Sequence, residues 1–240
     1  HDSSRKHKIL APTHDELDLL RREELEAYIR RHNPDCIVHA AGLVGGIQDN
    51  IANPLDYFTV NQDIGANVLR AAQAAGVPRV VNLGSSCMYP KGSEMPLSEE
   101  MLLTGALEPT NEAYALAKIL TWKLGEYVSK ANCSTQVKTL VPCNLYGRHD
   151  DFSPQKSHLV PAIIEKLHAA TVSGSTVVEI WGDGSARREF MYSADMADAI
   201  FFAVENFEFI PSVMNIGTGI DYSIKEYYEL AAKIVGYCGS

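Results

Sequence analysis

Short apolar runs alternate with longer amphipathic segments along most of this 240-residue chain. Such alternation is typical of an α/β fold, in which crossover helices cover a mostly parallel sheet whose core strands are buried on both faces. The apolar runs are bounded by polar, Gly or Pro residues, which predicts strands at 8–11, 36–41, 80–83, 137–141 and 177–181. The amphipathic segments predict helices over 23–31, 54–75, 112–130, 158–170, 193–206 and 223–235.

Serine residues mark the starts of two predicted helices. The hydroxyls of Ser193 and Ser223 can each satisfy an unpaired amide of the first turn, and Glu226 is placed to complete a capping box with Ser223. Farther upstream, we expect the helices over 54–75 and 112–130 to pack beside each other on one face of the sheet. This packing would bring residues early in the second of these helices to the ends of the strands.

The loops after Ala41, Leu83 and Val141 directly follow three predicted strands. In open parallel sheets, ligands bind in the crevice outside the carboxyl ends of the strands, so these loops are the expected binding site. A dinucleotide-binding fold normally begins with a strand, a glycine-rich turn and a helix whose amino terminus holds the pyrophosphate. No glycine precedes Lys8, so we expect a Rossmann-like, doubly wound parallel sheet whose first strand and glycine-rich turn are missing from this sequence.

The length of the chain lies at the upper edge of what one α/β domain usually holds. We expect residues 1–150 to form a dinucleotide-binding core that is incomplete at its N-terminus. Residues 151–240 should form mainly a smaller substrate-binding lobe with returning core elements, incomplete at its C-terminus.

The composition argues against several classes of function. The formal net charge of −9 disfavours a nucleic-acid-binding surface, because phosphate backbones are held mainly by clustered Lys and Arg. The five cysteines show no paired CxxC spacing, which indicates neither a metal site nor a disulfide framework and fits a reducing cytoplasm. No apolar run approaches the roughly 20 residues that a bilayer-spanning helix needs, so no membrane association is expected.

The strongest chemical signal is Tyr114 followed by Lys118, about one turn apart on one face of a predicted helix. Alone, such a pair is a weak signal, because it also arises by chance in helices. It gains weight from Ser85 and Ser86, which follow the predicted strand 80–83. A neighbouring ammonium favours the phenolate of a tyrosine, so this set can exchange protons near neutral pH while Ser85 hydrogen-bonds a reacting carbonyl.

Four segments together carry a resemblance to a known family: VGGIQDN (44–50), LGSSCMYP (83–90), LEPTNEAYALAK (107–118) and NLYGRHDDF (144–152). The strand, the serine and the YxxxK pair resemble the extended short-chain dehydrogenase/reductase superfamily. The combination of segments is similar to its GDP-L-fucose synthase family, from about Thr13 to Tyr237. The resemblance implies a homodimeric enzyme that uses NADP(H) for 3,5-epimerisation and 4-reduction of a GDP-sugar, GDP-4-keto-6-deoxy-D-mannose, to give GDP-L-fucose.

The resemblance also implies roles for particular residues. The catalytic residues would be Ser85, Cys87, Tyr114, Lys118 and His158, with Cys87 and His158 as the acid/base pair of the epimerisation. Cofactor contacts would come from Ala40, Ala41, Leu83, Gly84, Ser85, Ser86, Tyr114, Lys118, Pro142, Cys143, Asn144, Leu145 and His158. Substrate contacts would come from Ser85, Cys87, Asn144, Lys166, Trp181 and Arg188, since cations pair with diphosphates and an indole can stack on a ligand.

Two other functions stay open at this point. One is a C4-reductase or epimerase of the same fold that acts on a related nucleotide sugar, such as a GDP-heptose. The other is a non-catalytic nucleotide-binding domain, which the missing amino-terminal element favours and the coexistence of Ser85, Tyr114 and Lys118 disfavours. Single residues also have structural interpretations, with Cys87 as a small buried side chain and His158 as a surface donor.

Overall fold

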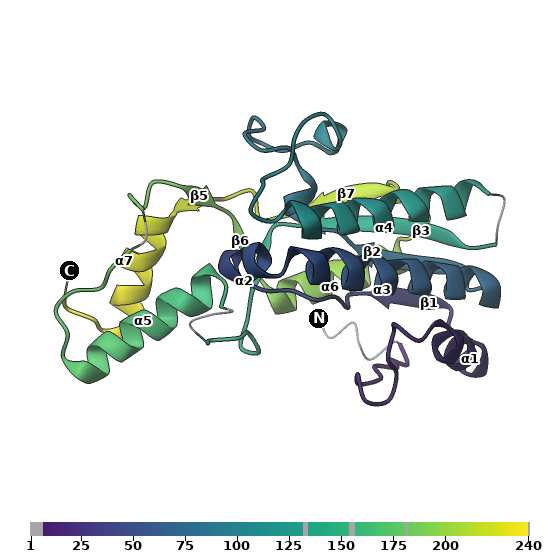
Figure 1. Ribbon diagram of the computed structural model, residues 1–240, viewed down its shortest axis with the longest axis horizontal. Helices are drawn as coiled ribbons and strands as arrows, with labels where there is room; N and C mark the ends of the chain where they lie inside the picture. The colour runs from purple at the N-terminus through teal and green to yellow at the C-terminus, as the bar shows by residue number, and fades with distance from the viewer. Residues whose placement is uncertain (1–6, 132–133, 154–156, 181, 240) are drawn as a thin grey trace.

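Four parallel strands form the central sheet, in the spatial order β1, β2, β3 and β7 (Figure 1). They are β1 (Cys36–His39), β2 (Arg79–Leu83), β3 (Gln136–Pro142) and β7 (Val213–Ile216). The computed structural model that shows them describes residues 7–131, 134–153, 157–180 and 182–239. The two central strands are the most deeply buried, because they have a strand on each side and helices on each face.

Three of the predicted strands are confirmed and two are wrong. The runs at 36–41, 80–83 and 137–141 form β1, β2 and β3, whereas β7 was not predicted. Residues 8–11 and 177–180 pair with no strand of the described residues, and residue 181 lies outside the described residues. Ile9 and Leu10 stay exposed, whereas Val178 and Ile180 are half-buried against the cluster of α5 and α7. Burial on both faces holds for β2 and β3 but not for the edge strand β1, where Val38 is 41% exposed.

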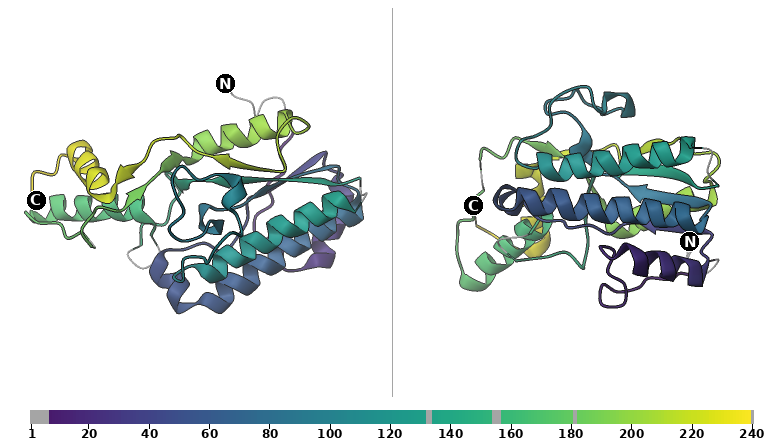
Figure 2. Two further views of the ribbon diagram at one scale, coloured as in Figure 1. Left: turned by 90° about the horizontal axis from the view of Figure 1, so that it is seen from above. Right: turned by 45° about the vertical axis from the view of Figure 1, so that its right-hand side comes forward.

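Helices cover both faces of the sheet (Figure 2). The helices α3 (Pro54–Ala75) and α4 (Glu112–Lys130) have the predicted bounds and lie side by side on one face, as expected, while α6 (Ser193–Glu205) lies on the other. Proline suits the first turn of α3, and Gly76 ends this helix with a φ of 72° that favours glycine. Small residues allow the close packing, since a Cβ at Gly125 of α4 would lie 2.7 Å from the Cγ1 of Val137.

Shorter helices complete this part of the molecule. The helix α1 (Arg22–His32) packs on α3 through Leu25 and Ile29, and α2 (Ile47–Ala52) leads into α3. Two single turns of 3₁₀-helix, η2 (Ser86–Met88) and η3 (Glu99–Met101), follow β2. None of the helices that the structure describes is both long and apolar enough to cross a bilayer.

A second part of the molecule extends from one end of the sheet (Figure 1). There β4 (Asn144–Tyr146) pairs in parallel with β6 (Phe190–Tyr192), and β5 (Arg187–Arg188) pairs antiparallel with β8 (Tyr222–Ser223). The helices α5 (Leu159–Ser173) and α7 (Ile224–Val235) pack around an apolar cluster of their own. We call α5, α7, β5 and β8 the outer lobe, and the four-stranded sheet with α3, α4 and α6 the sheet core.

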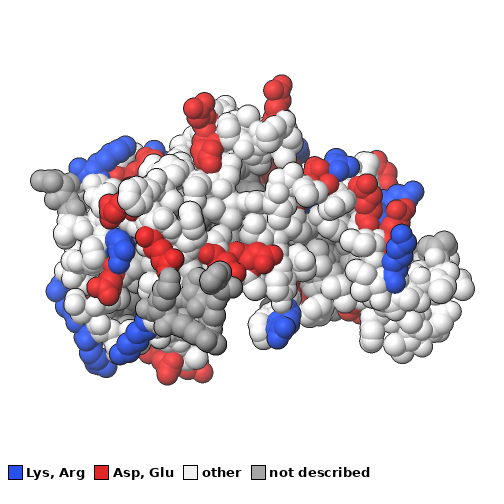
Figure 3. Space-filling model, turned by 180° about the vertical axis from the view of Figure 1, so that it is seen from behind, with Lys and Arg blue, Asp and Glu red and all other residues white. Residues whose placement is uncertain are grey.

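The two predicted serine caps have opposite outcomes. Ser223 caps α7 as expected, because its Oγ accepts from the Glu226 amide at 3.1 Å and the Glu226 carboxylate accepts from the Ser223 amide at 2.6 Å. Ser193 is the first residue of α6 rather than its cap, and the N-cap residue Tyr192 makes no side-chain capping bond. Seen from behind, acidic groups lie across the middle of the face and at both of its ends, whereas most basic groups lie toward the ends (Figure 3).

Candidate active site

Lys118 lies beneath the carboxyl ends of the strands, in the second turn of α4. Its side chain is buried, and its Nζ donates a hydrogen bond to the backbone oxygen of Leu83, the last residue of β2, at 3.1 Å. A Cβ at Gly42, in the loop after β1, would lie 3.7 Å from the same Nζ. Burial lowers the pKa of Lys118 to about 8. The loops after β1 and β2 therefore meet over a buried cation.

Tyr114 lies one turn before Lys118 on the same side of α4. The Nζ of Lys118 is 5.7 Å from the centroid of the phenol ring, and Tyr57 contacts this ring edge-on at 6.5 Å between centroids. Burial raises the pKa of Tyr114 above its usual 10, Cys87 and Tyr57 raise it further, and a hydrogen bond with Ser85 lowers it. The hydroxyls of Ser85 and Tyr114 therefore lie in the same crevice.

This raised pKa corrects the expectation that Lys118 makes Tyr114 a phenolate. The ammonium lies beside the ring, while burial dominates at the hydroxyl and disfavours the charged form. Near neutral pH the side chain is thus a protonated phenol, which is a proton donor rather than a base.

Cys87 stands beside Ser85 in the turn after β2. The backbone amide of Cys87 donates to the Oγ of Ser85 at 3.3 Å, and the side-chain amide of Asn111 donates to its Sγ at 3.0 Å. Burial raises the pKa of the thiol, whereas hydrogen bonds from Ser85 and Asn111 and the positive charge of Arg188 lower it. The turn can approach β3 this closely because Gly84 has no side chain, since a Cβ there would lie 3.3 Å from the Cγ2 atoms of Thr139 and Val141.

The predicted cofactor residues after β1 and β3 also lie at this end of the sheet. Ala40 and Ala41 directly follow β1 and are exposed, while Pro142 ends β3 and is buried. Asn144 uses its side-chain amide to donate to the backbone oxygen of Glu189 at 3.0 Å, which holds β4 against the segment before β6. Cys143 and Leu145, which flank Asn144, are partly buried.

These residues fit the nicotinamide end of a dinucleotide. Small residues at the ends of β1 and β2 leave room for a ligand to approach the backbone. An ammonium has three N–H donors, and Lys118 uses one of them for Leu83 in the hydrogen bonds of the described residues. A ribose hydroxyl is a suitable acceptor for a second.

The predicted residues beyond β4 are less closely gathered. His158 is the exposed N-cap residue of α5, and no hydrogen bond among the described residues joins it to Cys87. The Nζ of Lys166 donates to the backbone oxygen of Glu179 at 3.2 Å. Arg188 is exposed but acts electrostatically on the Cys87 thiol, whereas Trp181 lies outside the described residues.

Sequence reasoning missed three side chains that shape the crevice. Asn111 contacts the Cys87 sulfur, and its position directly before a predicted helix was the available signal. Asn61 holds the loop after β1, because it accepts from the Leu43 amide at 2.9 Å and donates to the Leu43 oxygen at 3.0 Å. Tyr57 donates to Asp49 at 2.7 Å. Asn61 and Tyr57 are buried polar residues of α3, which a helical pattern shows only as interruptions of an apolar face.

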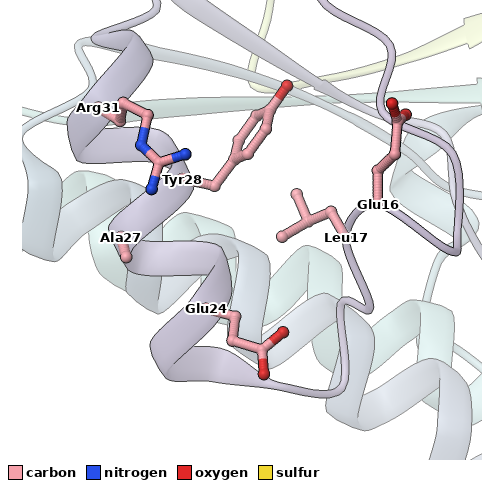
Figure 4. Close-up of a pocket in the computed structure, with 6 residues that line it drawn as sticks. All are labelled: Glu16, Leu17, Glu24, Ala27, Tyr28 and Arg31. Carbon is pink, nitrogen blue, oxygen red and sulfur yellow. The ribbon is translucent and has the colours of Figure 1, made fainter.

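A separate pocket of about 230 Å³ lies between α1 and the turn before it, lined by Glu16, Leu17, Glu24, Ala27, Tyr28 and Arg31 (Figure 4). Figure 4 shows the Leu17 side chain pointing from the turn toward α1. The Glu24 carboxylate accepts from the Arg21 Nη1 at 3.0 Å. None of the lining residues belongs to the predicted site. We therefore place the chemistry at the strand ends rather than in this pocket.

Comparison with known proteins gives the same family from sequence and from structure. The GDP-L-colitose synthase of Yersinia pseudotuberculosis is 49% identical over 240 residues, which cover 100% of this chain and 78% of that protein. The GDP-L-fucose synthase of Azorhizobium caulinodans is 50% identical over 232 residues, which cover 97% of this chain and 74% of that protein. The structure of a GDP-mannoheptose C4 reductase from Campylobacter jejuni with NADP bound superposes with a TM-score of 0.86 at 31% identity, over 97% of this chain and 79% of that one. The sequence profile of the NAD dependent epimerase/dehydratase family matches residues 1–217, and the chain belongs to this family.

Proposed function

We propose that this chain is an NADPH-dependent enzyme that epimerises C3 and C5 of GDP-4-keto-6-deoxy-D-mannose and reduces C4, which yields GDP-L-fucose. The observation that carries the proposal is the convergence of Ser85, Cys87, Tyr114 and Lys118 at the carboxyl ends of the strands. The names of the two similar synthases, for GDP-L-fucose and GDP-L-colitose, support this class of substrate. The NADP in the similar C4 reductase supports the cofactor.

The epimerisation uses the acidity that a ketone gives to the carbons beside it. The Cys87 thiolate takes a proton from C3 or C5, and the electron pair moves to the C4 oxygen as an enolate. The Ser85 hydroxyl hydrogen-bonds this oxygen and stabilises its charge. His158 returns a proton to the opposite face of the carbon, which inverts the centre. Reduction must come second, because it removes the ketone that makes these carbons acidic.

The reduction uses the protonated phenol of Tyr114. Burial keeps its pKa above 10, so the side chain carries a proton at neutral pH and donates it to the C4 oxygen. The positive charge of Lys118 beside the ring stabilises the phenolate that remains. When bound, NADPH supplies the hydride. The residues that would hold it are Lys118, Tyr114, His158, Ala40, Ala41, the turn 83–86 and the segment 142–145.

The outer lobe and the segments beside it supply the substrate contacts in this proposal. Lys166 on α5 and Arg188 on β5 are cations suited to a diphosphate, and Arg can pair with it through two parallel hydrogen bonds. Trp181 and Asn144 are assigned to the same ligand from the family resemblance. Residues 1–150 thus serve mainly as the dinucleotide-binding core and residues 151–240 mainly as the substrate-binding lobe, with α6 and β7 returning to the sheet.

We also propose a homodimer that forms through α4. Leu116, Leu120 and Tyr127 make an exposed apolar stripe on α4, with exposed fractions of 39%, 47% and 61%. A monomer rarely leaves such a stripe uncovered on a long helix. A second copy of the chain would bury this stripe. Analytical ultracentrifugation of the wild-type protein and of Leu120→Glu tests whether the dimer forms through it.

The cytoplasmic location expected from the cysteines stays a prediction.

One experiment tests the function by separating its two stages. With GDP-4-keto-6-deoxy-D-mannose in deuterated water, Cys87→Ser should stop deuterium exchange at C3 and C5 yet still reduce the ketone slowly, because a hydroxyl is a far weaker acid than a thiol. Tyr114→Phe should keep the exchange and lose NADPH oxidation. Cys36→Ser, at a half-buried cysteine of β1, is the matched control and should change neither rate.

The outcomes separate the main function from the alternative. Absence of exchange in the wild-type protein, with intact NADPH oxidation, would favour a simple C4-reductase, the activity in the name of the similar Campylobacter jejuni protein. Exchange at the wild-type rate in Cys87→Ser would refute Cys87 as the base of the epimerisation. Oxidation of NADPH at the wild-type rate in Tyr114→Phe would refute the reductase mechanism itself.

A further inference from the structure

Asn111 occupies the N-cap position of α4 but does not cap the helix. An asparagine at this position usually accepts a hydrogen bond from an amide of the first turn, which stabilises the helix. Here the Asn111 side chain makes no capping bond, and its Nδ2 instead donates to the Sγ of Cys87 at 3.0 Å. Its Oδ1 is buried without a hydrogen-bond partner among the described residues. Folding alone does not explain a residue that gives up a cap and leaves a buried acceptor unpaired.

The sulfur that Asn111 contacts needs donors if it is to become a thiolate. Cys87 packs against the apolar cluster around Met88, Leu102 and Trp122, and this environment disfavours a negative charge. The titratable and charged groups that face the thiol are Tyr114 from α4 and Arg188 from β5, with Tyr89 in the same cluster.

Ser85 shares the stabilisation of the thiolate with Asn111, because a hydrogen bond from Ser85 also lowers the pKa of the Cys87 thiol. The Tyr89 hydroxyl donates elsewhere, to the Oδ1 of Asn215 at 2.6 Å. Arg188 is exposed and its Nη1 donates to the backbone oxygen of Arg187 at 2.7 Å. The Ser85 hydroxyl is assigned to the reacting carbonyl in the proposed mechanism. Asn111 is half-buried at the N-cap position of α4, and its Nδ2 already points at the sulfur in the absence of substrate.

We propose that Asn111 is the positioning residue of the epimerisation, whose amide holds the Cys87 sulfur in the crevice and stabilises its thiolate by hydrogen bonding. This inference rests on the proposed function, because it assigns to Cys87 the base of that reaction. The amide matches the proton cycle of the sulfur: its N–H donates strongly while the sulfur is a thiolate and only weakly after the sulfur has taken the proton from carbon.

Alkylation of Cys87 by iodoacetamide tests the proposal without any substrate. The rate at Cys87 is followed by mass spectrometry of its peptide across a pH series, with the exposed Cys238 of the same molecule as the internal reference. Asn111→Ala should slow the alkylation of Cys87 at pH 7 about tenfold relative to Cys238 and move the midpoint of the pH profile up by about one unit, since one pKa unit is a tenfold change in thiolate. Thr110→Ala, at the neighbouring residue whose hydroxyl bonds Glu108, should leave both values unchanged.

Asn111→Asp keeps the shape of the side chain and places a carboxylate against the sulfur, so its midpoint should rise further than that of Asn111→Ala. This second variant also tests the proposal if Asn111→Ala does not fold.

With substrate, deuterium exchange by Asn111→Ala should fall at pH 7 and recover at higher pH, while NADPH oxidation of a ketone that needs no epimerisation is retained. An unchanged alkylation midpoint in both variants would overturn the inference. A shifted midpoint in a protein that exchanges no deuterium even as wild type would instead contradict the proposed function and leave the contact between Asn111 and Cys87 standing.

Discussion

The sheet core and the outer lobe hold their candidate site residues in different ways. Ser85, Cys87, Tyr114 and Lys118 in the core are buried or half-buried, and each is fixed by a hydrogen bond or a ring contact. The lobe places His158 at the exposed end of α5 and Arg188 on an exposed two-residue strand. The core thus carries pre-organised proton-transfer groups whose burial costs stability, whereas the lobe carries solvated groups that only a bound substrate would order.

The largest expected effect tests the cost of burial in the core. Burial lowers the pKa of Lys118 from 10.5 to about 8, so between these values the unfolded chain holds a proton that the folded chain has lost, and stability rises with pH across this window. Below pH 8 the full cost is present. Lys118→Met should therefore raise the free energy of unfolding at pH 7 by roughly 3 kcal/mol, at ~1.36 kcal/mol per pKa unit, and abolish NADPH oxidation.

Urea unfolding at a series of pH values checks this prediction. The difference between Lys118→Met and wild type should shrink as the pH approaches 10.5. Lys123→Met is the matched control, because Lys123 lies on the same helix, is only half-buried, and pairs with Glu126 at 2.5 Å. A loss of stability in Lys118→Met at pH 7 would mean that the hydrogen bond to Leu83 outweighs desolvation, and the contrast between core and lobe would weaken.

A second buried group of the core should make the fold acid-sensitive. His39 ends β1 and is 5% exposed, and burial together with the Lys118 charge lowers its pKa from 6.5 to about 3. As the pH falls below 6.5, the unfolded chain gains a proton that the folded chain cannot, so stability present at neutral pH is lost. At pH 5 this loss should be about 2 kcal/mol. His39→Gln should remove most of that slope in urea unfolding between pH 7 and 5, and an unaltered slope would show that His39 is not held neutral.

The lobe should respond through substrate binding rather than through stability. Lys166→Met removes a half-buried cation of α5 whose Nζ donates to the Glu179 oxygen, so its KM for the GDP-sugar should rise about tenfold, or ~1.4 kcal/mol, with kcat retained. Lys233→Met, at an exposed lysine of α7, is the control in the same lobe. A fall in kcat at unchanged KM would instead show that Lys166 acts in the transition state. The lobe would then contribute to the chemical step, as the core does.

Local patterns predicted the elements whose contacts are close in sequence. The bounds of α3 and α4 follow from their helical periodicity and from the end signals Pro54 and Gly76. In contrast, β7 escaped prediction because its place depends on distant contacts: Asn215 receives the Tyr89 hydroxyl at 2.6 Å and donates to the Leu97 oxygen at 3.0 Å. The run 8–11 shows the reverse error, since an apolar pattern does not tell whether a partner strand exists.

In the candidate site, too, some features were predictable from local sequence patterns and others were not. The YxxxK spacing and the serine after β2 were enough to predict that Ser85, Tyr114 and Lys118 meet at one crevice. The spacing did not predict how deeply the Tyr114 hydroxyl is buried. This burial raises the pKa of Tyr114, whereas the expected effect of Lys118 was to lower it. The contact of Asn111 with Cys87 was equally hidden, because an asparagine before a helix normally indicates only a cap.

The smallest expected effect compares one serine of the lobe with one of the core. Ser223 caps α7 through a capping box with Glu226, whereas Ser193, at the start of α6, makes no capping bond. Ser223→Ala should cost about 1 kcal/mol, and because α7 rests on a small cluster apart from the sheet, this loss should appear as local opening of the lobe. Amide hydrogen exchange should show protection in α7 reduced about fivefold, while protection in β2 and β3 stays the same. Ser193→Ala should change the protection of α6 far less. Equal losses in both helices would mean that an alanine at either start weakens the whole fold, so that the lobe and the core open together rather than as separate units.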